Sequence, residues 1–190
     1  MTLVRSGRGE ERIWRCPAHK GIKVALARVV EIDESLVARR KYNRGHNVAQ
    51  RWVFGGICPA TGEGFLQMIP DKSAATLLPL IQEHIAPGSI IHSDGNPSYN
   101  NIVNLPVNPP YQHLVVVHDR NFVDPITGAC TNHIECFWKN CKRKFKYMCG
   151  VQNTNLGSHL DEFMWRERFG KTHQEALANI MQHLSEWYPV

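Results

Sequence analysis

Three acidic side chains in unlike local settings are the residues of this chain most able to do chemistry. Asp33 lies in the β-branched segment V-V-E-I-D-E-S, Asp94 follows the short apolar run S-I-I-H-S, and Glu135 lies near the start of the amphipathic segment T-N-H-I-E-C-F-W-K-N. If a fold brings them together, the carboxylates form a site for Mg²⁺ or Mn²⁺, which prefer oxygen ligands. Two such ions about 4 Å apart can stabilise both the attacking and the leaving oxygen of a phosphoryl transfer.

Each of these acids also has a simpler explanation. Asp33 lies between two glutamates, so one face of its strand could be exposed, although its apolar neighbours indicate burial and a buried lone carboxylate is costly. Asp94 could be an ordinary turn aspartate. Glu135 could complete a capping box with Asn132 or pair with Lys139 one helical turn later. The hypothesis of a metal site therefore depends on one fold converging all three.

Basic residues concentrate beside the acidic positions. The net charge is +5 and the isoelectric point about 9.0, which fits a nucleic-acid partner without demanding one. Two clusters, R-R-K-Y-N-R and K-N-C-K-R-K-F-K, adjoin Asp33 and Glu135, as a polyanionic substrate would require. Either cluster alone could be a solvated face. The predicted DNA-binding residues are Arg39, Arg40, Lys41, Arg44, Lys139, Lys142, Arg143 and Lys146.

Composition predicts one globular domain with no membrane partner. The chain has 190 residues, 43% of them hydrophobic and 21% charged. No apolar run approaches the roughly 18 residues of a membrane span, and the first residues are not typical of a secretory signal. Six cysteines without a C-x-x-C pair favour reduced thiols in a cytosolic or nuclear protein. Cys136 and Cys141 are interpreted as buried thiols rather than zinc ligands.

The elements that must position the acids follow from periodicity and turn residues. Strands are predicted at 24–37, 50–57, 64–69, 89–93 and 113–117, with the first three linked as antiparallel neighbours. The helical crossover at 73–85, capped by Ser73, should return the fourth strand parallel to the first. The resulting α/β fold is a mixed five-stranded sheet with helices on both faces. It would make Asp33 and Asp94 neighbours at strand ends, where ligands of open sheets tend to bind.

The remaining helices are predicted from their apolar stripes. One begins after Thr131, and another is centred on 156–164. A third begins with a capping box from Thr172 to Glu175 and is expected to bury a core stripe. That stripe consists of Leu177, Ile180, Met181 and Leu184.

Several long segments in a fixed order carry a resemblance to a known family. They are V-E-I-D-E-S (30–35), K-Y-N-R-G (41–45), W-V-F-G-G-I (52–57), T-L-L-P-L-I (76–81), S-D (93–94), N-F-V-D-P-I-T-G-A-C-T-N-H-I-E (121–135) and L-D-E-F-M-W-R-E-R-F (160–169). From about Val24 to Phe169 the chain resembles the catalytic domain of DDE transposases of the Merlin superfamily and their bacterial insertion-sequence relatives. Because the matching segments are long and specific, a cellular RNase H-like nuclease is the weaker reading.

The resemblance implies an RNase H-like catalytic domain over 24–190 that cuts DNA at transposon ends and joins the 3′ hydroxyl to target DNA. It maps the catalytic and metal-binding acids to Asp33, Asp94 and Glu135. It gives His118 and Asn132 roles in contacting substrate and positioning Glu135, although a core or capping role suits each equally well. It implies DNA as the partner and is compatible with a homo-oligomer on DNA. The location would be the nucleus in a eukaryote and the cytoplasm otherwise.

The N-terminal segment departs from the family pattern. Residues 1–23 are predicted to be irregular, and only W-R-C-P-A-H-K (14–20) resembles a piece of the zinc ribbon that family members usually carry. One cysteine and one histidine cannot complete a tetrahedral zinc site. The chain is therefore expected to be a truncated copy or a host-retained derivative. The alternative function is a transposon-derived module that binds DNA or protein without turnover.

Overall fold

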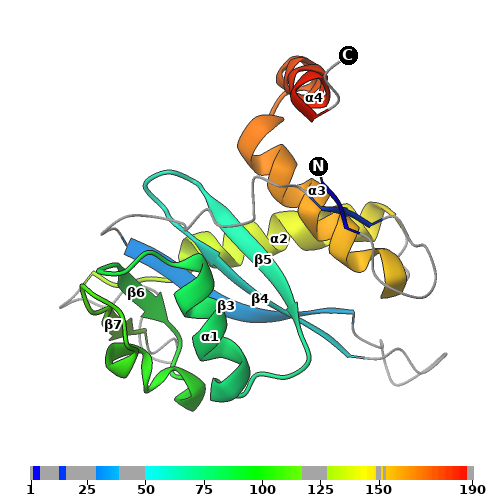
Figure 1. Ribbon diagram of the computed structural model, residues 1–190. Helices are drawn as coiled ribbons and strands as arrows, with labels where there is room; N and C mark the ends of the chain where they lie inside the picture. The colour runs from blue at the N-terminus through cyan, green and yellow to red at the C-terminus, as the bar shows by residue number, and fades with distance from the viewer. Residues whose placement is uncertain are drawn as a thin grey trace. The chain divides into compact units, whose positions relative to one another are not determined.

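The computed structural model describes residues 2–4, 13–15, 29–38, 50–116, 128–148, 151 and 153–187 (Figure 1). It forms two compact units, one of Lys23–Gly150 and the other of Met1–Ile22 with Val151–Val190. The sequence analysis assigned 24–190 to a single catalytic domain, whereas the structure groups the helices after residue 150 with the N-terminal segment. We describe each unit by itself.

The larger unit is built on a five-stranded sheet in the order β5-β4-β3-β6-β7. The strands are β3 (Val29–Ala38), β4 (Arg51–Ile57), β5 (Gly64–Ile69), β6 (Ile90–Ser93) and β7 (Gln112–Val115). β3, β4 and β5 are antiparallel neighbours, while β6 pairs parallel to both β3 and β7. This order and these directions confirm the predicted mixed sheet of an RNase H-like fold. Residues 24–28, predicted to begin the first strand, lie outside the described residues.

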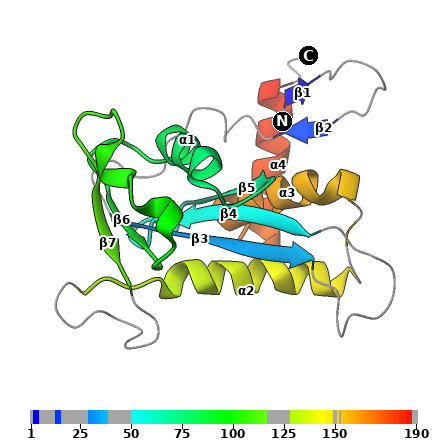
Figure 2. The same ribbon diagram turned by 90° about the horizontal axis from the view of Figure 1, so that it is seen from below.

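Helices cover both faces of this sheet, as predicted (Figure 2). Helix α2 (Asn132–Tyr147) runs along β3 and β4 on one face, and helix α1 (Ala74–His84) lies on the other. Two short 3₁₀ turns, η2 (Pro97–Tyr99) and η3 (Ile102–Asn104), connect β6 to β7. The predicted apolar stripe of α2 is buried and comprises Ile134, Phe137, Trp138, Cys141 and Phe145.

The helix caps differ in detail from the sequence-based expectation. Ser73 is the N-cap residue of α1, but its side chain makes no capping bond. Asp71 holds the turn instead, because its Oδ1 accepts hydrogen bonds from the Ser73 amide at 2.9 Å and from Thr76 Oγ1 at 2.8 Å. Helix α2 begins at Asn132, so Asn132 is not the N-cap, and the alternative of an Asn132–Glu135 capping box is wrong. The N-cap position belongs to Thr131, whose side chain makes no capping bond.

Close packing between β4 and α2 leaves no room for a side chain at Gly55. A Cβ there would lie 2.7 Å from Leu66 Cδ2 and 2.9 Å from Trp138 Cζ2. We expect Gly55→Ala to lower the free energy of unfolding by about 1–3 kcal/mol, the usual cost of overpacking a core. Urea unfolding measures this change. Gly95→Ala is the matched control, because a Cβ at Gly95 would meet nothing within 4 Å; equal effects of the two substitutions would contradict the packing described.

The smaller unit contains two short strands and two helices. β1 (Thr2–Val4) and β2 (Ile13–Arg15) form an antiparallel pair, so the expectation of irregular structure does not hold for these six residues. A 3₁₀ turn, η4 (Asn153–Asn155), leads into α3 (Leu156–Phe169), and α4 (His173–Trp187) follows. The predicted capping box is confirmed: the Glu175 amide donates to Thr172 Oγ1, and the Thr172 amide donates to Glu175 Oε2, both at 3.2 Å.

The prediction of a core stripe on α4 is wrong. Leu177 is 67% exposed and Met181 61%, while Ile180 and Leu184 are 39% and 43% exposed. Helix α4 contacts α3 through Ala176 instead, which packs against Trp165. Trp165 Nε1 also donates a hydrogen bond of 3.1 Å to His183 Nδ1. None of the described helices combines the length and the hydropathy that crossing a membrane requires.

Candidate active site

Strand pairing places Asp33 beside Asp94. β3 and β6 are parallel, with Val29 opposite Ile90 and Glu31 opposite His92. Continuing this register by two residues brings Asp33 opposite Asp94, immediately after the last residue of β6. Because residues two apart on a strand share a face, Glu31 and Asp33 both face the side covered by α2. The predicted neighbourhood of the first two acids is therefore confirmed by the sheet.

Asp33 is held in a setting that opposes its negative charge. Burial, followed by the neighbouring charges of Glu34 and Asp94, raises the pKa of Asp33 from 3.8 to about 7. The buried indole N–H of Trp138 lies close enough to lower that pKa a little, yet it makes no well-formed hydrogen bond. A cation bound nearby would favour the ionised form of this carboxyl group and so lower its pKa.

Asp94 lies in a turn that its own side chain helps to hold. Its Oδ1 accepts a hydrogen bond of 3.1 Å from the Asn96 amide, which is the turn role expected of an aspartate. Ser93 Oγ donates to the Asp94 carbonyl at 2.8 Å and lies 2.8 Å from His113 Nε2. The turn role and the proposed metal-binding role of Asp94 are therefore compatible, because among the described residues the turn bond engages only one of its two carboxylate oxygens.

Glu34 is a carboxylate of this region that the sequence analysis did not single out. Its Oε1 accepts hydrogen bonds from Tyr99 Oη and, at 3.1 Å, from Asn96 Nδ2. Burial raises its pKa, and the charge of Asp94 adds to the increase, while Lys72 opposes it. Its position next to Asp33 in sequence was the available signal. Adjacent residues of a strand face opposite sides, so Glu34 belongs to the α1 face rather than to that of Asp33.

Tyr99 lies beside the acidic residues but is unsuited to act as a nucleophile. Its side chain is fully buried, and its hydroxyl is committed to Glu34. Burial, together with the nearby charges of Glu34 and Asp33, raises the pKa of Tyr99.

Glu135 lies in the first turn of α2 and is exposed to solvent. Its amide donates a hydrogen bond of 3.2 Å to the Thr131 carbonyl, as expected within a helix. Trp138 follows one turn later on the same side of α2 and lies next to Asp33. The helix therefore directs Glu135 toward the end of the sheet that carries Asp33.

The three predicted acids are not drawn together as tightly as a shared ion would require. Among the described residues, the only group of three or more metal-ligating side chains whose donor atoms all lie within 4.8 Å is Glu31, Cys130 and His133. Asp33, Asp94 and Glu135 form no such group. To share an ion, at least one of the three carboxylates would have to change position from the arrangement described.

The donor chemistry of the predicted site fits a hard divalent cation. The three acids offer only carboxylate oxygens, the ligands that Mg²⁺ and Mn²⁺ prefer. The raised pKa of Asp33 marks a place where negative charge lacks compensation. These features favour a cation over a purely structural role for the carboxylates.

The predicted DNA-binding and positioning residues are only partly described. Lys139, Lys142, Arg143 and Lys146 are all exposed on α2. Arg39, Arg40, Lys41 and Arg44 lie outside the described residues, and so does His118. Asn132 is partly exposed as the first residue of α2, and its positioning role remains a prediction.

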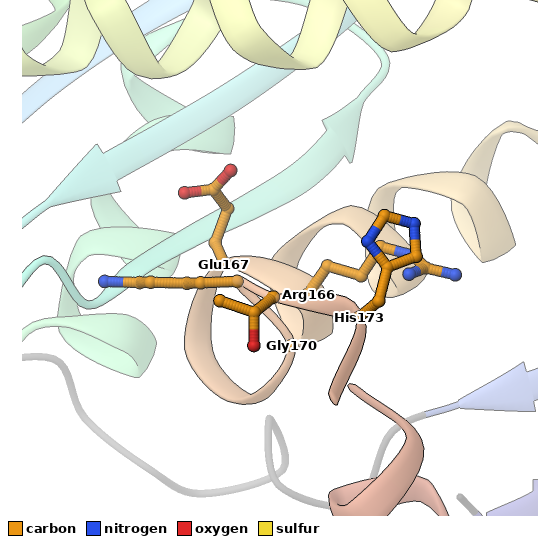
Figure 3. A pocket seen from close by; sticks show the side chains of 6 residues that line it. Arg166, Glu167, Gly170 and His173 are labelled. Atoms are coloured by element: carbon orange, nitrogen blue, oxygen red, sulfur yellow. The ribbon is translucent and has the colours of Figure 1, made fainter. Parts of the chain in front are cut away.

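A pocket in the smaller unit lies at the turn between α3 and α4 (Figure 3). Charged and polar residues line it, and none of the three predicted acids is among them. The lining residues are Arg166, Glu167, Gly170, Lys171, Thr172 and His173. The pocket therefore does not include the predicted acidic site.

Comparison with known proteins decides the family. Residues 25–168 match the model of the ISXO2-like transposase domain, a span that includes Asp33, Asp94 and Glu135. The chain belongs to the ISXO2-like transposase domain family. This transposase domain is also 28% identical over 117 residues to a transposase-like protein of Haemophilus influenzae, covering 62% of the chain and 89% of that relative.

Two viral integrase cores resemble the ISXO2-like domain at low identity. The catalytic core of HTLV-2 integrase in complex with magnesium is 12% identical, with a TM-score of 0.49 over 77% of this chain and 88% of the other. The catalytic core of BIV integrase is 15% identical, with a TM-score of 0.49 over 74% and 82%. Family membership rests on the ISXO2-like match and not on these likenesses.

Proposed function

We propose that this ISXO2-like domain cleaves DNA phosphodiester bonds and transfers the resulting strands, with Asp33, Asp94 and Glu135 as the catalytic acids. One observation carries the proposal. Two carboxyl groups from adjacent parallel strands lie side by side, and one of them, Asp33, has its pKa raised to about 7. Perturbed carboxyl groups of this kind gather where a protein binds ions or performs acid–base chemistry.

In the proposed reaction, the three acids would hold one or two Mg²⁺ or Mn²⁺ ions. When bound, these ions stabilise negative charge on the entering and leaving oxygens of an in-line displacement. The chain itself contributes position and charge. The β3–β6 pairing fixes the spacing of Asp33 and Asp94, and α2 carries Glu135. Water or a 3′ hydroxyl is the nucleophile, so no covalent bond between protein and DNA forms.

Two finer assignments belong to the same proposal. The long segments that resemble Merlin elements, including V-E-I-D-E-S and the stretch from Asn121 to Glu135, support a placement near that superfamily. The partner is DNA, and a second copy of the chain bound to the same DNA fits a reaction that joins two ends.

A module that binds DNA without turnover is the second candidate. Its supporting observation is the wider separation of the three acids noted above.

A cleavage assay tests the proposal directly. Supercoiled plasmid incubated with the full chain and Mn²⁺ should be nicked, and chelation by EDTA should stop the reaction. Omitting the protein and replacing Mn²⁺ by Ca²⁺ are the controls. Binding of the plasmid without nicking, under both Mg²⁺ and Mn²⁺, would favour the second candidate.

The exposed basic residues of α2 should contact DNA phosphates. Each such contact contributes about 0.9 to the slope of log affinity against log salt concentration, because it releases counterions. We expect Lys142→Ala/Lys146→Ala to weaken binding to unrelated duplexes alike and to reduce that slope by about 2. The double variant Arg168→Ala/Lys171→Ala removes the same charge from exposed positions of the smaller unit and should change the slope less. Fluorescence anisotropy at several salt concentrations measures both, and equal slopes for the two variants would contradict the assignment.

A further inference from the structure

The buried carboxylate of Glu31 ties helix α2 to strand β3. Glu31 lies two residues before Asp33 on β3, and it is fully buried. Its Oε2 accepts hydrogen bonds from the His133 amide at 2.8 Å and from the Ile134 amide at 3.0 Å. These amides belong to the first turn of α2, where backbone N–H groups have no partner within the helix. A side chain separated by about a hundred residues in sequence therefore caps the helix.

Two further groups converge on the other oxygen of Glu31. His133 Nδ1 lies 2.7 Å from Oε1, and Cys130 Sγ lies 3.5 Å from it. His92 Nδ1 in turn lies 3.3 Å from the Cys130 carbonyl, so the segment entering the helix is also held to β6. A buried carboxylate with this many donors is well compensated, because hydrogen bonds and the positive end of the helix replace its lost hydration.

We infer that Glu31 is a positioning residue, which sets where α2 presents Glu135 relative to Asp33. The inference rests on the proposed function, since it assigns Glu135 to the metal site. The capped amide of Ile134 immediately precedes Glu135 in the chain, and Asp33 follows Glu31 on the same face of β3. One carboxylate is therefore fixed within two residues of two of the three catalytic acids. If Glu31 held α2 less firmly, the distance between Asp33 and Glu135 would change while both carboxylates remained.

The test compares Glu31→Gln with wild type for its dependence on Mn²⁺. Gln keeps one oxygen that can accept from the two amides but loses the charge, so the helix should remain folded yet less firmly held. We expect the Mn²⁺ concentration for half-maximal cleavage to rise about tenfold, while affinity for DNA without metal stays unchanged. Amide hydrogen exchange at His133 and Ile134 should become several times faster. A purely structural role would lower stability without moving the metal dependence.

Two matched variants serve as controls. Glu83→Gln makes the same change in charge on the exposed side of α1 and should leave the metal dependence as in wild type. His133→Asn removes the imidazole but keeps both capped amides, so its shift should be much smaller than that of Glu31→Gln. Glu31→Ala removes the carboxylate entirely. If that variant does not fold, Glu31→Gln still tests whether Glu31 affects the metal dependence.

Three results would overturn the inference, and they differ from one another. If Glu31→Gln needs no more Mn²⁺ than wild type, the positioning role is wrong while the proposed function stands. If wild type neither binds Mn²⁺ nor cleaves, the proposed function fails as well, and the faster exchange at α2 would then report capping alone. If Co²⁺ gives a thiolate charge-transfer band that Cys130→Ser removes and Cys136→Ser retains, then Glu31, Cys130 and His133 bind a metal, and the carboxylate is a ligand rather than a cap.

Discussion

Asp94→Asn should lower the rate of metal-dependent DNA cleavage by on the order of 10³-fold, equivalent to about 4 kcal/mol of transition-state stabilisation. A neutral amide is a much poorer ligand for Mg²⁺ or Mn²⁺ than a carboxylate. The fold should be unaffected, because the amide oxygen of Asn can still accept the Asn96 amide that Asp94 holds at 3.1 Å. Nicking of supercoiled plasmid under single-turnover conditions measures the rate.

Binding measurements separate loss of chemistry from loss of substrate. DNA affinity of the Asp94→Asn variant should match that of wild type or exceed it slightly, since one negative charge near the phosphates is gone. Glu83→Gln, which makes the same change in charge on the exposed side of α1, should cleave normally. Cleavage by Asp94→Asn within threefold of the wild-type rate, or DNA trapped covalently on the protein, would rule out the proposed mechanism.

Asp33→Asn should make the metal-free protein more stable at pH 8 by about 2 kcal/mol, although it destroys activity. The pKa of Asp33 is about 7 in the folded protein and 3.8 in the reference state. Between these values the folded state keeps a proton that the unfolded state has lost, so rising pH lowers the stability of wild type. Above pH 7 the loss is complete, and Asn avoids it. The shift alone corresponds to a larger energy, which we reduce because the site is only partly enclosed.

Divalent cations should reverse this ranking. A ligand that binds only the folded state stabilises it in proportion to the logarithm of its concentration above the dissociation constant. Mn²⁺ should therefore stabilise wild type at pH 8 and have little effect on Asp33→Asn. Thermal unfolding at pH 4.5 and pH 8, with Mn²⁺ and with EDTA, measures how pH and the metal each change the stability of the two proteins. Equal stability of the two proteins at both pH values would show that Asp33 carries no unfavourable charge.

The sheet could be predicted because its determinants are local. β3, β4 and β5 pair as antiparallel neighbours in chain order, and β6 returns beside β3 in parallel after helix α1, as the sequence pattern predicts. Once that order is known, the neighbourhood of Asp33 and Asp94 follows from strand register. The apolar stripe of α2 could likewise be predicted, because it repeats with the period of a helix. The Thr172–Glu175 capping box could be predicted because its two residues lie three apart in a local motif.

Contacts between distant segments could not be predicted in the same way. The sequence predicted no role for Glu31, because its partners are backbone amides of α2, whose positions cannot be read from residue types. Glu34 is bound by Tyr99 and Asn96 from the turn after β6. On α4, periodicity correctly indicates an amphipathic helix, but it does not say whether a partner covers the apolar side. In the structure this apolar side is exposed at Leu177 and Met181.

Anomalous scattering from crystals of the protein grown with Mn²⁺ and a DNA duplex tests the central claim most directly. The account predicts one or two Mn²⁺ peaks bound by carboxylate oxygens of Asp33, Asp94 and Glu135, with metal–oxygen distances of about 2.0–2.4 Å. It also predicts that Glu31 keeps its bonds to the His133 and Ile134 amides in that complex. Mn²⁺ bound instead by Glu31, Cys130 and His133, or Glu135 left more than about 10 Å from an ion held by the two aspartates, would contradict it.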